Sequence, residues 1–143
     1  MANAASRGHF PVVKWLHENI AHEDFQTMVL DLAVFNGDLS LLKWLHTNRP
    51  NERWSTFAVD IAAQCGHLHV LRWLLDHKQL YKHHGFSIHM RALTLAIQGN
   101  HFDAVLLVHY EFQEWNSSSM MPMNNDSYND HIKAWLQEEL GLF

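Results

Sequence analysis

The sequence predicts an all-α solenoid of about four helix-turn-helix units, the first one truncated, with a C-terminal capping helix. The main observation is an internal repeat. Segment 62–75 has counterparts 29 and 58 residues earlier, at 33–46 and 4–17, and a weaker counterpart 34 residues later at 96–109. A fixed period in this range indicates a small unit that can bury its apolar face only against copies of itself.

A turn residue at one fixed place in every copy is the second observation. Gly8, Gly37 and Gly66 close the first helix of three copies, and the fourth copy has Asn100 there. Glycine adopts a positive φ without strain and asparagine is the next most tolerant residue, so each position is predicted to be a left-handed helix C-terminus.

The second helix of each unit is predicted from a stripe of apolar residues. In the third copy the stripe is Val70, Leu71, Leu74 and Leu75, at the spacing of one helix face. Trp73 and its counterparts Trp15 and Trp44 widen it, and we interpret all three as core or flanking residues rather than a ligand site.

The repeats divide the chain into an array, a linker and a last helix. Residues 113–130 are polar and aperiodic, which predicts a mobile linker. The helix in 131–143 is predicted to cover the fourth unit. The predicted array is 1–112, with units at about 1–19, 25–48, 55–77 and 90–112.

The distribution of charge argues against nucleic acid as a partner. Residues 1–110 hold nine basic and nine acidic side chains, whereas residues 111–143 hold one basic and six acidic ones and so carry the whole net charge of −5. The array therefore lacks the basic stripe that phosphate binding needs.

Location follows from the segments that the sequence lacks. No stretch resembles a signal peptide or is long and apolar enough to be a membrane span, provided that Met1 is the true start. The single cysteine, Cys65, cannot form an internal disulfide, which suits a reducing compartment. We expect no membrane association and a cytoplasmic or nuclear location.

At these residues the chain resembles the ankyrin-repeat family. The family pattern Ala-Ala-x-x-Gly-His, followed by two apolar pairs, is matched by 62–75. The short-period Gly-His-Leu-x-Val-x-x-Trp-Leu form is similar to arrays of oomycetes, amoebae and giant viruses. The family's Thr-Pro-Leu-His opening is absent, and Asp31 and Asp60 are expected to replace part of its hydrogen bonding. The resemblance implies a module that binds another protein through a concave groove.

The residues expected to bind a partner come from two places. The resemblance implies that the two x positions of each copy face the groove, and the connection 78–90, five residues longer than the others, is expected to project beside it. Phe35 is a large aromatic where the fold needs nothing apolar, although it could instead fold back on a neighbouring unit. Cys65 is either an exposed thiol or an inert small residue. The candidate protein-binding residues are Arg7, Phe35, Asn36, Arg53, Gln64, Cys65, Tyr81, Lys82, Phe86 and Gln98.

Catalysis and metal binding are disfavoured. No phosphate-binding glycine loop, nucleophile elbow or His-Glu-x-x-His motif is present. We expect no enzyme activity and no cofactor. Six of the thirteen histidines occupy shared repeat positions, and the histidines of the long connection, His77, His83, His84 and His89, are the candidate zinc ligands.

Two other functions stay open at this point. The chain could be a structural fragment of a longer ankyrin solenoid without a partner of its own, because its first copy begins in the middle of a helix. It could also be a metal-binding protein that uses the histidine-rich connection. The incomplete first unit could associate with a second copy of the chain.

Overall fold

The structure is a computed structural model that describes residues 2–19, 28–49, 55, 57–77, 87–111 and 128–140. Every regular element in these ranges is an α-helix, which confirms the predicted all-α solenoid. The helices are α1 (Ala2–Ser6), α2 (Phe10–Asn19), α3 (Met28–Phe35), α4 (Leu39–Asn48), α5 (Ala58–Cys65), α6 (Leu68–Asp76), α7 (Ser87–Gln98), α8 (Phe102–Glu111) and α9 (Asp130–Leu140).

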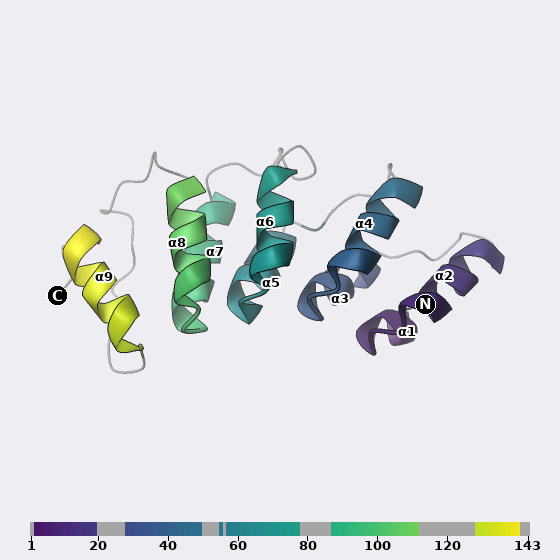
Figure 1. Ribbon diagram of the computed structural model, residues 1–143, viewed down its shortest axis with the longest axis horizontal. Coiled ribbons are helices and arrows are strands. Elements are labelled where there is room, and N and C mark those ends of the chain that lie inside the picture. Colours follow the sequence, from purple (N-terminus) through teal and green to yellow (C-terminus); the bar gives the residue numbers. More distant parts are fainter. Residues whose placement is uncertain are drawn as a thin grey trace.

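The helices form two rows (Figure 1). The first helices α1, α3, α5 and α7 contact one another in chain order, and the second helices α2, α4, α6 and α8 stand beside them in the same order. Helix α9 continues the row of second helices at the C-terminal end (Figure 1). The chain is therefore a single stack with α1 and α2 at one end and α9 at the other.

All four turns inside the units have the same geometry. Gly8, Gly37 and Gly66 each have φ of 69°, and Asn100 has φ of 58°, so the predicted left-handed positions are confirmed. The residue directly after each of these turn residues donates its amide back to the first helix, in a closing pattern typical of a left-handed C-terminus. These bonds are His9 to Ala4, Asp38 to Ala33, His67 to Ala62 and His101 to Ala96, at 2.8 to 3.0 Å.

One position of the second helix forms the deepest part of the core. Val13, Leu42, Leu71 and Val105 are equivalent residues, and each is completely buried. Small residues line the facing side of the first helices, where Ala33, Ala62 and Ala96 are also inaccessible to solvent. The alanines let the two rows approach closely, and the larger aliphatic side chains fill the space between them.

A histidine lies against a tryptophan at three places along the row of second helices. His17 contacts Trp44, His46 contacts Trp73, and His109 contacts Trp135, with ring centroids 4.9, 5.5 and 5.0 Å apart and the rings nearly perpendicular. In each case the histidine comes from one helix and the tryptophan from the next helix in the row. Trp44 and Trp73 are therefore flanking residues of the stack, as the sequence predicts, whereas Trp15 is 58% exposed.

Helix α9 has the same register as the second helices before it. Asn129 precedes α9 as Asp38 precedes α4, and each side chain accepts the amide of the residue three places on, Ile132 or Leu41, at 2.9 Å. Asn129 also bonds to Asn100, with its amide N on Asn100 Oδ1 at 2.8 Å and its Nδ2 on the Asn100 carbonyl at 3.2 Å. The predicted capping helix is thus the second helix of an incomplete fifth unit.

Candidate protein-binding surface

The outer face of the first helices is an exposed strip of mixed apolar and polar side chains. The strip takes one face from each of α3, α5 and α7, where residues at a spacing of three or four lie on the same side of a helix. This face points away from the buried alanines. We call this strip the first-helix surface, and it consists of Leu32, Phe35, Phe57, Ile61, Gln64, Arg91, Leu95 and Gln98.

Phe35 is 60% exposed, so its side chain does not fold back on a neighbouring unit. Its backbone, in contrast, is held firmly. His67 Nε2 donates a hydrogen bond to the Phe35 carbonyl at 2.9 Å, and His69 Nε2 donates one to the carbonyl of Gly37 at 2.8 Å. The third unit therefore fixes the turn of the second unit and leaves the Phe35 ring in solvent.

Phe57 and Arg91 are part of the surface that the sequence analysis missed. Phe57 is 54% exposed, and the Arg91 guanidinium lies 4.7 Å from the centre of its ring, as a cation over an aromatic face. Arg91 also pairs with the buried carboxylate of Asp60. Aligning the third and fourth copies places Phe57 and Arg91 at one repeat position, and this alignment is the signal that could have found them.

The two repeat aspartates bond to the unit that follows each of them. Asp60 of the third unit bonds Arg91 of the fourth, and Asp31 of the second unit accepts a hydrogen bond from Ser55 before the third. Burial raises the pKa of both carboxyl groups, while the bonds from Arg91 and Ser55 act in the opposite direction. Both aspartates thus supply hydrogen bonds between units, a role more specific than the replacement of Thr and His bonds that the sequence predicts.

We expect Asp31→Asn to increase the free energy of unfolding at pH 7 and to reduce its pH dependence. The folded-state pKa of Asp31 lies above 3.8, so the folded chain retains a proton that the unfolded chain loses. This contribution is greatest below the unfolded pKa and is lost as the pH rises through the folded pKa. Urea titrations between about pH 4 and 7 measure the effect, with the exposed Asp76→Asn as control. A less stable Asp31→Asn chain at pH 7 would show that the ionised carboxylate is favourable.

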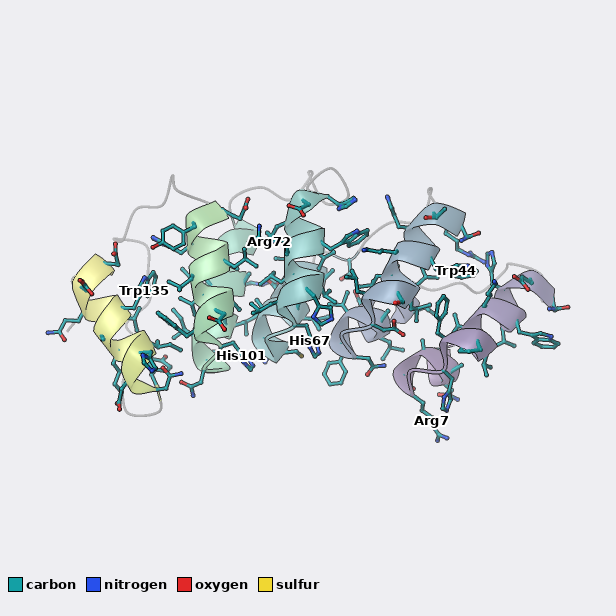
Figure 2. The ribbon with its side chains drawn as sticks, viewed as in Figure 1. Arg7, Trp44, His67, Arg72, His101 and Trp135 are labelled. Atoms are coloured by element: carbon teal, nitrogen blue, oxygen red, sulfur yellow. The ribbon has the colours of Figure 1, made fainter. Side chains whose placement is uncertain are left out.

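The other predicted binding residues have different environments. Arg7, Gln64 and Gln98 are exposed, and Figure 2 shows Arg7 at the edge of the molecule where the turn histidines His67 and His101 also lie. Arg53, Tyr81, Lys82 and Phe86 lie outside the described residues.

The side chains of Asn36 and Cys65 are less available to a partner than the sequence predicts. The Asn36 Nδ2 donates to the Ala5 carbonyl at 2.7 Å, and this bond joins the first two units. Cys65 is partly buried, and burial raises the pKa of its thiol. A raised pKa lowers the fraction of reactive thiolate, which favours the inert interpretation of Cys65.

Among the candidate zinc ligands, the structure describes the side chain of His77 alone. Its Nδ1 donates to the Trp73 carbonyl at 2.7 Å, and its ring stacks on Trp73 at 4.2 Å. His83 and His84 lie outside the described residues, and His89 lies in α7 with no described side chain. The described residues contain no group of three or more His, Cys, Asp or Glu placed to hold a metal ion.

The comparisons with known proteins identify the repeat. A family model described as ankyrin repeats in three copies matches residues 30–118, and one described as ankyrin repeats in many copies matches residues 1–46. No curated protein and no solved structure matched the chain. Within the described ranges, no helix has the length and apolar character to cross a bilayer. Ankyrin repeats are generally protein-interaction modules and are typically non-catalytic. Because the first model alone covers more than half of the sequence, the chain belongs to the ankyrin-repeat family.

Proposed function

We propose that this chain is a non-catalytic module that binds an apolar segment of a partner protein on its first-helix surface. The observation that carries the proposal is the exposure of Phe35 and Phe57, at 60% and 54%, on a surface where Leu32, Ile61 and Leu95 are also partly exposed. Large aromatic side chains that gain burial on association are frequent anchors of protein interfaces.

The chemistry around the two phenylalanines supports this proposal. Gln64 and Gln98 are exposed beside the apolar residues and can donate to or accept from a partner backbone. Arg91 is already paired with Asp60, so the surface carries little net charge of its own. We therefore propose a partner segment with apolar side chains and a neutral, hydrogen-bonding backbone. The connection 78–90 is the second part of the proposed binding site. The proposed cellular location is the cytoplasm or the nucleus.

The change Phe35→Ala should weaken partner binding by about 1–3 kcal/mol and change the free energy of unfolding by less than about 0.5 kcal/mol. The ring is exposed, so removing it leaves no cavity, whereas a bound partner would lose an anchor. Titration calorimetry with the protein that co-purifies with the wild-type chain measures the loss of binding. Urea denaturation measures the change in the free energy of unfolding.

A matched control is Tyr110→Ala, because Tyr110 is 59% exposed and lies on α8 rather than on the first-helix surface. This variant should bind the partner as the wild type does. Equal losses of affinity in Phe35→Ala and Tyr110→Ala would contradict the proposed site, as would a large loss of stability in Phe35→Ala.

A further inference from the structure

The N-terminal end of the stack has apolar residues that are more exposed than their counterparts in the later units. Val12 is 47% exposed, whereas its counterparts Leu41, Val70 and Ala104 are completely buried. Trp15 is 58% exposed, although the matching Trp44 lies half-buried against His17. Leu16 is partly exposed beside them, and we call Val12, Trp15 and Leu16 the α2 face.

The C-terminal end of the stack is closed by α9. The upstream side of α9 is apolar, with Ile132, Trp135 and Leu136 buried. Its contacts on the fourth unit are Trp135 with His109, His131 with Phe102, and Asn129 with Asn100.

The downstream side of α9 is polar. Asp130 and Gln137 are both exposed. They occupy the repeat positions that Phe102 and His109 occupy in α8. Repeat arrays need such polar outer faces at their ends. The downstream side of α9 therefore carries polar side chains at these two positions, as the outer face of a capping helix does.

The α2 face and α9 present the same three kinds of side chain in the same register. Val12, Trp15 and Leu16 are spaced as Ile132, Trp135 and Leu136 are, and the two sets occupy equivalent repeat positions. Each tryptophan belongs to the position that meets a histidine of the preceding second helix, as in the pair of Trp44 with His17. The α2 face thus has the residues needed to occupy the surface of the fourth unit that α9 covers.

We propose that the α2 face of one copy binds the fourth unit of a second copy when α9 is displaced, and that docked α9 prevents this association. In the resulting contact Trp15 lies against the partner's His109, in the place of Trp135. The contact joins unlike ends of two copies, so it continues into open chains rather than closing as a dimer. Docked α9 competes effectively because it is tethered to its own binding site. This proposal uses different residues from the first-helix surface and does not depend on it.

The test is sedimentation of three versions of the chain 1–143 over a range of concentrations. The wild type should be a monomer. Trp135→Asp, which puts a charge into the contact between α9 and the fourth unit, should associate with a weight-average mass that rises with concentration to about two chains or more. Adding Trp15→Asp to that variant should restore the monomer, because Trp15 is exposed in the wild type and its loss removes the α2 face.

Two further measurements keep the test decisive. Asn100→Gly retains a residue suited to positive φ and removes the Oδ1 that holds the Asn129 amide, so it should weaken α9 docking without placing a charge in the contact. Its chains should also associate, less strongly than those of Trp135→Asp. A synthetic peptide of residues 128–140 should dissociate the assemblies of both variants.

Several results would overturn the proposal. One is a monomer for both α9 variants while far-ultraviolet circular dichroism shows that the array remains helical. Another is association that Trp15→Asp does not reverse, or that the peptide does not inhibit. Association of the wild type to the same extent as Trp135→Asp would show that α9 does not control the contact.

Discussion

Replacing Gly66 by alanine should destabilise the chain by about 2–5 kcal/mol, the sum of a backbone and a packing cost. Gly66 has φ of 69°, where an L side chain is strained, and a Cβ atom there would collide with the ring of His101. That ring belongs to the fourth unit, so relieving the collision requires the third and fourth units to separate locally. Urea denaturation followed by circular dichroism measures the loss.

Gly8 provides the matched control for this substitution. It has the same φ of 69°, but a Cβ atom on Gly8 would have no neighbour within 4 Å. The difference arises because the second unit has Asp38 where the third and fourth have His67 and His101. Gly8→Ala should therefore cost only the backbone term, about 1–2 kcal/mol. Equal losses at both glycines would mean that the turn histidines do not pack against the preceding turns.

Leu41→Ala should cost about 2–5 kcal/mol, because Leu41 is completely buried between the second and first units and its removal leaves a cavity. The equivalent change at the exposed end of the stack is Val12→Ala, which should cost less than about 0.5 kcal/mol. Denaturant midpoints of both variants, with unchanged m-values, measure the two effects. A cost for Val12→Ala close to that for Leu41→Ala would show that Val12 is covered in solution.

The repeat register was predictable from sequence because each unit repeats the same local requirements. A left-handed turn selects glycine or asparagine, so Gly66 and Asn100 reveal their common conformation through residue type alone. A buried helix stripe selects aliphatic residues at a helical period, so the pattern at Val70 and Leu71 identified the core face. The same alignment identified Phe35 as an aromatic where the repeat needs nothing apolar, but it left open whether the ring is exposed, which the structure shows at 60%.

The contacts between units could not be predicted in the same way. Whether His67 bonds its own turn or the Phe35 carbonyl depends on how closely two units approach, and a single sequence does not contain that distance. The pairing of Arg91 with Asp60 and Phe57 joins elements 31 to 34 residues apart, across a connection of unequal length. The sequence predicts that the last helix covers the fourth unit, but not that α9 continues the row of second helices, because that place depends on the contacts of Asn129 with Asn100 and of Trp135 with His109.

The most direct test of the first-helix surface is site-specific photocrosslinking in cells. A photoreactive side chain is placed at Gln64, which is exposed on α5, or at Arg72, which is exposed on α6 in the other row (Figure 2). If the first-helix surface binds the partner, the chain with the probe at position 64 should form one discrete adduct, and the chain with the probe at position 72 should form none. An adduct from position 72 with none from position 64 would contradict the proposed surface.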